Sequence, residues 1–239
     1  MTNIRTTVKV LFVNEAGVKE LLPMESCIGL MRDALTTFAR GEAVLPLRSM
    51  VRLPDGSGIL GLMPGYLGHP QSFGLKVVSV MPGNHGTPYD SHQGVVMLFG
   101  LVHGEPLAIL DATAITAIRT AAASAAATDA LARADACDLA LIGSGTQGRT
   151  HLAAMRAVRK LRRVRVWSRT RANAERFARE EAASLGFAIE VAASAEDAVR
   201  GADLICTTTS AKEPVLRGAW LSPGVHVNAV GACFAATRE

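Results

Sequence analysis

Three glycines in the stretch LALIGSGTQGRTHLAAM, residues 139–155, have the spacing of a dinucleotide-binding loop. They are Gly143, Gly145 and Gly148, and they fit the pattern G-x-G-x-x-G. In such a loop the first glycine permits a tight turn, the second lets the backbone approach a pyrophosphate, and the third lets helix and strand pack closely. The preceding DLAL predicts a strand, and the following RTHLAAMRAV predicts a helix whose N-terminus faces the phosphates. A glycine-rich turn without a ligand is the alternative.

The end of the next predicted strand favours a ligand with an extra negative charge. An acidic residue usually stands there and accepts hydrogen bonds from the ribose 2′-hydroxyl group. This sequence instead has Ser168, Arg169 and Thr170, and residues 163–172 contain no Asp or Glu. A cation and two hydroxyl groups attract a 2′-phosphate, so we expect NADP(H) as the preferred cofactor and NAD(H) as the other candidate. The alternative is that Arg169 is only part of a solvated basic run.

Three isolated cations stand among apolar residues elsewhere in the chain. Lys76 lies in FGLKVVSV, Arg48 in LPLRSMV and Arg119 in TAITAIRTAAASAAA. Cations in such settings suggest a bound anion, most simply a carboxylate. For Lys76 the alternative is an edge-strand lysine that points to solvent.

The elements that position these residues follow two patterns. Residues 1–115 predict an α+β substrate-binding and dimerisation domain, and residues 116–239 predict a Rossmann-type doubly wound parallel sheet within an α/β fold. In the first part we expect a helix over 23–40 and a largely antiparallel meander, with strands near 8–13, 44–53, 58–63, 73–80, 94–99 and 106–110. A long helix capped by Asp111 or Thr113 follows. Beyond it we expect strands at 138–143, 163–168, 187–192, 203–208 and 224–231, alternating with helices at 146–159, 171–185 and 194–200. A second G-x-G-x-x-G match, GSGILG at residues 56–61, has no following helix and predicts a hairpin turn.

Composition narrows the class of protein. The chain has 239 residues, 49% of them hydrophobic, which indicates a substantial core and argues against disorder. A net charge of +4 does not argue for a nucleic-acid partner. The four cysteines and six histidines show no zinc or disulfide spacing, so we expect a reduced, cytoplasmic and metal-free protein. Arg119 and Asp129 interrupt the alanine-rich stretch 112–132, so no membrane span is expected there.

A set of motifs covering the whole chain resembles the ornithine cyclodeaminase/μ-crystallin family. They include LPLRSMVRLPDGSGILGLMPGY, GLKVVSVMPGN, SHQGVVMLF, ITAIRTAAASAAATDALA, LIGSGTQGRTHL, VRVWSRT, GADLICTTTSAKEPVL and GVHVNAVGA. The resemblance implies an NAD(P)-dependent enzyme, usually a homodimer, that acts on a small imino acid or amino acid. The family includes cyclodeaminases of ornithine or lysine, alanine dehydrogenases and reductases of cyclic imino acids.

The resemblance also assigns expected roles to individual residues. Arg48, Lys76 and Arg119 match positions that bind the substrate carboxylate, with Lys76 and Arg119 as the catalytic candidates. His92, in SHQ, is expected to line the pocket, with an ordinary loop histidine as the alternative. The expected cofactor-binding residues are Gly143, Gly145, Thr146, Gln147, Gly148, Ser168, Arg169, Thr170 and Thr208.

Two departures from the family pattern shape the functional hypothesis. Cyclodeaminases carry an aspartate just after the NAVG strand, where this chain has Cys233. Family members also continue for several tens of residues beyond the match to Glu239, so we expect the chain to be a fragment. We therefore expect reduction of the C=N bond of pyrroline-2-carboxylate or piperideine-2-carboxylate. The alternatives are ornithine cyclodeaminase, alanine dehydrogenase, and a non-catalytic ligand-binding protein or inactive fragment.

Overall fold

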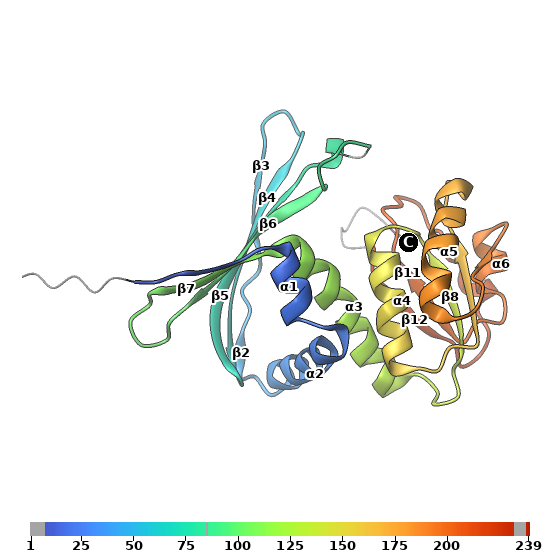
Figure 1. Cartoon of the computed structure of the whole chain (residues 1–239), viewed down its shortest axis with the longest axis horizontal. Helices are drawn as coiled ribbons and strands as arrows, with labels where there is room; N and C mark the ends of the chain where they lie inside the picture. Colours follow the sequence, from blue (N-terminus) through green and yellow to red (C-terminus); the bar gives the residue numbers. More distant parts are fainter. Residues whose placement is uncertain (1–7, 85, 232–237) are drawn as a thin grey trace, which may run out of the picture. The chain divides into compact units, whose positions relative to one another are not determined.

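The chain divides into two compact units, which are described separately below (Figure 1). The structure is a computed structural model and describes residues 8–84, 86–231 and 238–239. The first unit comprises residues 1–26 and 30–116, and the second comprises residues 27–29 and 117–239. No helix in the described part of the chain is long and apolar enough to cross a membrane.

A mixed sheet forms the centre of the first unit. Its described strands are β1 (Leu11–Val13), β2 (Ala43–Val44), β3 (Ser49–Arg52), β4 (Ile59–Gly68), β5 (Gln71–Val80), β6 (His92–Phe99) and β7 (Pro106–Asp111). The order is β1-β7-β6-β5-β4-β2, and β3 also pairs with β4. Only the β1–β7 pair is parallel. The predicted meander is therefore confirmed.

Strand β4 is longer than the sequence predicts. The expected strand ended at residue 63, because PGYLG carries turn residues, but β4 continues to Gly68 and pairs with β5 along its whole length. On the other side of β4, the pairing with β3 covers Ile59 to Leu62, and the pairing with β2 covers only Tyr66 and Leu67. The Gly68 N–H donates to Glu42 on the β2 side, at 2.8 Å. Because alternate residues of a strand direct their N–H groups to the same side, the missing N–H of Pro64 falls in this gap and costs no ladder bond.

Two helices accompany this sheet. The helix α2 (Met24–Ala39) is as predicted, and it ends before Gly41, whose φ is +75°. A shorter helix, α1 (Glu15–Leu21), was not predicted and packs against β1 and β7 (Figure 1). Its N-cap Asn14 accepts a hydrogen bond from the Gly17 N–H at 3.0 Å. A 3-10 turn, η1 (Pro82–Asn84), follows β5.

The helix α3 (Ala112–Leu131) starts directly after β7. The Asp111 carboxylate accepts a hydrogen bond from the Ala114 N–H at 2.7 Å, so Asp111 is the cap of the two residues that the sequence offered. The hydrogen bonds of Thr113 and Thr116 within this region are to the His92 and Ala112 carbonyls, at 3.2 and 2.5 Å. The start of α3 is thus fixed to the end of the sheet.

The second unit contains a five-stranded parallel sheet with the order β10-β9-β8-β11-β12. Its strands are β8 (Asp138–Ile142), β9 (Arg163–Trp167), β10 (Glu190–Val191), β11 (Leu204–Thr207) and β12 (His226–Ala229). In chain order this is 3-2-1-4-5, the order of a dinucleotide-binding fold. The predicted doubly wound sheet is confirmed, and all residues of β8 and β11 are buried, as expected for central parallel strands.

Helices cover both faces of this sheet. They are α4 (Thr146–Val158), α5 (Arg171–Leu185) and α6 (Ala195–Val199), and a 3-10 turn, η2 (Gly218–Trp220), precedes β12. Ala140 and Ile142 of β8 pack with Ala198 of α6 in one apolar cluster. On the opposite face the Asn228 amide contacts Cys206 and Met155 of α4 at 3.7 and 4.0 Å. Burial raises the pKa of Cys206 to about 12, so its thiol is inert in this core.

The second match to the glycine pattern is a hairpin, as predicted. The Leu53 N–H donates to the Gly58 carbonyl at 2.9 Å, and Gly56 has a φ of +72°. This turn joins β3 to β4, so no helix N-terminus is available at it.

A buried histidine joins α3 to α4. The Nδ1 atom of His151 lies 2.7 Å from the Gln147 carbonyl, and Nε2 lies 3.0 Å from the Ser124 hydroxyl. A carbonyl only accepts, so Nδ1 carries the proton and Nε2 accepts from Ser124. Burial lowers the pKa of His151 below its ordinary value of 6.5, with weaker opposing contributions from the Gln147 carbonyl and Glu239.

We expect acidification to destabilise the protein through His151. The unfolded ring binds a proton near its ordinary pKa of 6.5, and the folded ring does so only at lower pH. This contribution to stability is therefore complete above pH 6.5 and is lost as the pH falls through the folded pKa. Urea unfolding at several pH values checks this, and each unit of pKa difference corresponds to about 1.4 kcal/mol. His151→Gln should reduce the pH dependence, whereas His103→Gln, at an exposed site, should not. Equal pH dependence in the parent and His151→Gln would contradict it.

Candidate functional site

The glycine loop joins β8 to α4 at the carboxyl end of the parallel sheet. Gly143 has a φ of +113°, and a Cβ atom there would lie 2.8 Å from the Thr208 carbonyl and hydroxyl oxygens. A Cβ atom on Gly148 would lie 2.5 Å from the Gly143 carbonyl oxygen. Both positions therefore require glycine for backbone reasons. Gly145 differs, because a Cβ atom there would meet nothing within 4 Å.

The N-terminus of α4 fits a phosphate-bearing ligand. Gly145 is its N-cap and supplies no side-chain hydrogen bond, so the first N–H groups of Thr146 and Gln147 have no capping side chain. These groups and the helix dipole favour an anion. The Gln147 Oε1 atom is buried and makes no hydrogen bond within the described structure. The open space at Gly145 leaves room for a pyrophosphate, and the Gln147 amide oxygen could accept a hydrogen bond only from a donor such as a ribose hydroxyl group.

Arg169 differs from most of its basic neighbours. The guanidinium groups of Arg162, Arg163 and Arg171 pair with Asp138, Glu190 and Glu175, at 3.0, 2.6 and 2.8 Å. Arg165 is buried and donates to two carbonyls at the end of α6, at 2.7 and 2.8 Å. Arg169 lies just after β9, is exposed, and has no hydrogen bond or ion pair to any described residue. Ser168 is half-buried beside it, and Thr170 is the N-cap of α5 without a capping hydrogen bond.

Two further residues meet at the same edge of the sheet. Thr208 follows β11, and its hydroxyl donates to the Ile142 carbonyl at 3.2 Å, which ties β11 to the glycine loop. The Glu239 carboxylate accepts from the Thr207 hydroxyl at 2.8 Å and from the N–H groups of Thr209 and Gly231. Sequence reasoning named Thr208 but gave Glu239 no role. Glu239 lies about thirty residues after Thr207 and Thr209 in the chain, and no local sequence pattern indicates that it returns to them.

The first unit holds a separate open pocket of about 580 Å³. It lies beside Met63–Gly65, where β4 has no neighbour between β2 and β3, and the loop at residues 45–48 lines its other side. Arg48 comes from that loop and Lys76 from β5. The remaining walls are apolar or glycine: Leu45, Pro46, Leu47, Met63, Pro64, Gly65, Gly74, Leu75 and Val96. The pocket thus offers two cations and no carboxylate to a ligand.

Lys76 is not an edge-strand residue. It pairs with Met63 on β4 and with Val96 on β6, so β5 is an interior strand. Its side chain is half-buried, and Nζ lies 2.6 Å from the Thr116 hydroxyl oxygen. Sequence reasoning did not include Thr116 in the site, although its spacing of three residues from Arg119 places both on neighbouring turns of one helix.

The structure does not bring all the predicted substrate residues into this pocket. His92 begins β6, is exposed, and lies 3.0 Å from the Ser91 hydroxyl through Nδ1; it does not line the pocket. Arg119 is exposed on α3, in the part of that helix that groups with the second unit. Cys233, where the cyclodeaminase pattern has an acid, lies outside the described residues.

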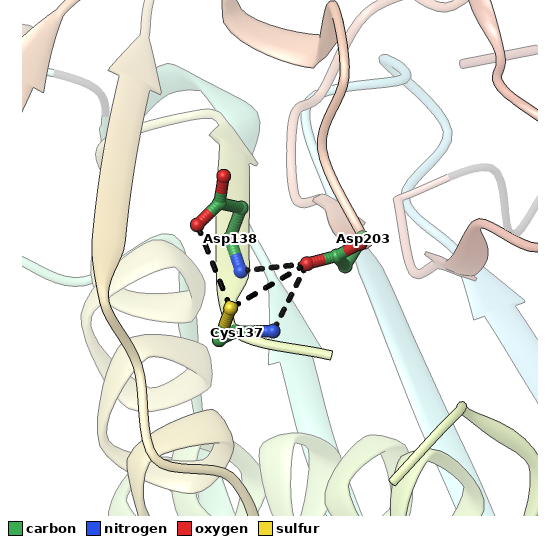
Figure 2. Close-up of side chains that lie close together, drawn as sticks. All are labelled: Cys137, Asp138 and Asp203. Atoms are coloured by element: carbon green, nitrogen blue, oxygen red, sulfur yellow. Dashed lines mark hydrogen bonds between the residues drawn. The ribbon is translucent and has the colours of Figure 1, made fainter. Parts of the chain in front are cut away.

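One group of side chains has the composition of a metal site, but its members form hydrogen bonds and ion pairs within the protein. Cys137, Asp138 and Asp203 lie close together where β8 and β11 begin (Figure 2). Asp203 accepts from the Cys137 and Asp138 N–H groups at 3.0 and 3.1 Å, and it also pairs with Arg133. Burial raises its pKa, but these N–H groups and arginine charges outweigh burial and lower it overall. Burial raises the pKa of Cys137, which makes its thiol a poor ligand. The group is a structural bridge at the sheet edge opposite the glycine loop.

Comparison with known proteins identifies relatives of the whole described chain. The model of the ornithine cyclodeaminase/mu-crystallin family matches residues 8–239. Ketimine reductase mu-crystallin from Mus musculus is 39% identical over 212 residues, which cover 87% of this chain and 66% of that protein. The chain thus spans slightly less than two thirds of that relative.

Solved structures of two enzymes also resemble the chain. Thermococcus litoralis Delta(1)-pyrroline-2-carboxylate reductase, in complex with NADH and L-proline, has a TM-score of 0.87 and 34% identity, covering 91% of this chain and 68% of its own. An archaeal alanine dehydrogenase dimer with bound NAD has a TM-score of 0.89 and 30% identity, covering 96% and 70%.

Alanine substitutions at two of the glycines should separate ligand binding from folding. Gly148→Ala is expected to destabilise the fold by about 1–3 kcal/mol, because its Cβ would press on the Gly143 carbonyl. Gly145→Ala should cost about 1 kcal/mol or less, because its Cβ enters open space and only the preference of the N-cap for glycine over alanine is lost. The same Gly145→Ala change should weaken dinucleotide binding at least about tenfold, by obstructing the approach of the pyrophosphate. Chemical unfolding and fluorescence titration with NADPH measure the two effects. Unchanged NADPH affinity in Gly145→Ala would contradict the assignment.

Proposed function

Because the chain belongs to the ornithine cyclodeaminase/mu-crystallin family, we propose that it reduces the C=N bond of small cyclic imino acids with a nicotinamide cofactor. The observation that carries this proposal is the pocket in the first unit, where Arg48 and Lys76 stand among apolar walls. Such a pocket suits a carboxylate on an apolar ring. Relatives described as ketimine reductase and pyrroline-2-carboxylate reductase support the same reaction.

In this proposal the cations hold and orient the substrate. The Arg48 guanidinium binds the carboxylate, since planar guanidinium groups match carboxylates in geometry and charge, and the family resemblance assigns Arg119 to the same role. The Lys76 ammonium contacts the substrate and gives a proton to the imine nitrogen as the carbon accepts a hydride. The nicotinamide, when bound, supplies that hydride. The carbon gains hydride and the nitrogen gains a proton, so the product is the cyclic amino acid.

Ornithine cyclodeamination fits the described residues less well. Ornithine carries a second ammonium group, and that reaction needs a base for the attacking amine and an acid to release ammonia. The described pocket has cations but no carboxylate that would hold or deprotonate this amine. At the position where the cyclodeaminase pattern has aspartate, the sequence has Cys233. A neutral thiol, with an ordinary pKa near 8.5, is a poor substitute.

We further propose that NADPH is preferred over NADH. Arg169 stands at the end of β9 without a carboxylate partner among the described residues, between the hydroxyl groups of Ser168 and Thr170. A 2′-phosphate would supply the missing anion. The paired state of Arg162, Arg163 and Arg171 distinguishes Arg169 from a general solvated basic run.

We also propose a homodimer formed through the first unit. This unit exposes many large apolar side chains for a folded protein, with Phe12 exposed by 71% and Leu47 by 94%. Further exposed apolar side chains, on the strands of this unit, include Leu11, Val44, Met50, Val51, Leu60, Phe73 and Leu107. Exposed apolar surface of this extent is typical of an interface. The archaeal alanine dehydrogenase neighbour is itself described as a dimer.

The substrate class is tested by supplying candidate substrates to the purified protein. Pyrroline-2-carboxylate or piperideine-2-carboxylate should oxidise one equivalent of NADPH, followed at 340 nm, with the cyclic amino acid as product. Ornithine should give no proline by mass spectrometry. Proline from ornithine, without net consumption of cofactor, would instead identify a cyclodeaminase.

Two variants and a control connect this activity to the site. Lys76→Ala and Arg119→Ala should each abolish turnover while leaving NADPH affinity nearly unchanged, because a hydrogen bond to a charged group contributes about 1.5–3 kcal/mol and misplacement adds to the loss. Lys19→Ala removes an exposed lysine paired with Glu15 and should leave the rate unchanged. Near-normal rates in Lys76→Ala would assign that lysine a structural role only.

Reversing the charge at Arg169 should reverse the cofactor preference. Arg169→Asp replaces attraction by repulsion at the 2′-phosphate and leaves an acceptor for a 2′-hydroxyl group, so NADH should bind more tightly than NADPH. Titration of both cofactors against the parent and the variant measures the ratio of affinities. Arg156→Asp, an exposed change on α4, is the matched control and should preserve the preference for NADPH. Equal affinities of the parent for the two cofactors would refute this proposal.

A further inference from the structure

We infer that Thr116 is a positioning residue for Lys76, whose ammonium it holds in the pocket by accepting a hydrogen bond. The inference rests on the proposed function, in which Lys76 acts on the substrate. The Lys76 Nζ atom lies 2.6 Å from the Thr116 Oγ1 atom, at a partly buried position. This is a short, charge-assisted contact between residues 40 positions apart in the sequence.

The second hydrogen bond of Thr116 fixes the direction of the first. Its hydroxyl lies 2.5 Å from the Ala112 carbonyl oxygen. A carbonyl only accepts, and a hydroxyl has one proton, so that proton is directed to Ala112. Thr116 therefore presents lone pairs to Nζ, and the lysine must donate. A side chain that lacked this oxygen, or that offered a proton instead, could not hold the ammonium in the same way.

Both partners of this contact are anchored to regular structure. Lys76 is paired in the sheet with Val96 on β6, and the next residue of β6 toward its start, Val95, pairs with Asp111 at the end of β7. Asp111 caps α3 through the Ala114 N–H at 2.7 Å. The helix start that carries Thr116 is thus set by the strand register that sets Lys76. The contact adds a constraint that strand pairing does not supply, on the flexible end of the lysine side chain.

Positioning matters here because lysine loses more rotamer freedom than most side chains when it is held in one place. An ammonium released from Thr116 can adopt other rotamers, and a proton donor that is misplaced by about an ångström slows a reaction severely. Arg119 follows Thr116 by three residues on the same helix. The helical segment that holds Lys76 thus also carries the other catalytic candidate.

Three variants separate the hydroxyl group from its surroundings. Thr116→Val keeps the shape and removes the acceptor, and Thr116→Ser keeps the acceptor and removes a methyl group. Thr36→Val is the matched control, because the Thr36 hydroxyl makes the same kind of bond within a helix, to the Arg32 carbonyl at 2.8 Å, on an exposed face. Steady-state kinetics with pyrroline-2-carboxylate and NADPH, and the rate of Lys76 acetylation by acetic anhydride from peptide mass spectrometry, are measured for each protein.

We expect kcat/KM in Thr116→Val to fall roughly tenfold to a hundredfold, the range for loss of one hydrogen bond to a charged group. The dissociation constant for NADPH should stay within about twofold, because the cofactor loop is untouched. Lys76 should be acetylated severalfold faster, since its amine has lost the hydrogen bond to Thr116. Thr116→Ser should recover kcat/KM to within about threefold of the parent, and Thr36→Val should match the parent in every measurement. A purely structural role would not produce recovery by serine together with a change in lysine reactivity.

Parent-like kcat/KM and parent-like acetylation of Lys76 in Thr116→Val would overturn the inference. If that variant unfolds, Thr116→Ala removes the same hydroxyl and is judged by the same two measurements. If the parent reduces none of the imines, the proposed function fails, and the acetylation rates alone decide whether Thr116 holds Lys76. Faster acetylation in the variant then supports the contact, and an unchanged rate rejects it.

Discussion

The close approach of two backbone segments at the carboxyl end of β8 is the constraint on which the cofactor site depends. The Gly143 carbonyl oxygen lies only 2.5 Å from the position that a Cβ atom on Gly148 would take, and Thr208 lies 2.8 Å from the position of a Cβ atom on Gly143. Only glycine at both positions lets α4 begin so near the strand. That proximity directs the free N–H groups of α4 toward the sheet edge, where Arg169 and Thr208 also lie after their own strands. The ability of this edge to bind a dinucleotide therefore depends first on backbone packing, and the side chains add selectivity among cofactors.

In the first unit, the main constraint is that a charged amine, that of Lys76, lies on an interior strand of the sheet. An ammonium group on an interior strand must find polar partners, because burial without them is costly. Lys76 meets this requirement through the Thr116 hydroxyl on one side and an open pocket on the other. The pocket exists because β2 and β3 are separate short strands that leave part of β4 uncovered. Strand interruption and the placement of the charge are thus two aspects of one arrangement.

Local patterns predicted the elements well, and contacts distant in sequence set the limits of prediction. The alternation of strands and helices after Asp111 predicted the doubly wound sheet, because the central strands β8 and β11 are short apolar runs and turn residues separate the strands from the helices. The predicted extent of β4 was wrong, because PGYLG has the composition of a turn. Only the gap between β2 and β3 beside Pro64 explains why a strand can continue through this proline. The helix α1 is too short for periodicity to reveal. The contact of Thr116 with Lys76 was invisible for a related reason: helical spacing relates Thr116 to Arg119, but only strand register relates it to Lys76.

The gap beside Pro64 has a consequence for how such a protein can diversify. Residues 45–48 line the pocket but pair with no strand, so no backbone ladder depends on their conformation. Leu47 is almost fully exposed within its own unit, so the fold of that unit does not fix its size. Natural variation or directed evolution in this loop can therefore change which ring or chain the pocket admits, while the strands that place Lys76 stay in register. Substrate selectivity would thus depend on the loop at residues 45–48, whereas folding depends on the paired strands. This separation makes the loop a favourable place for new substrate preferences to arise.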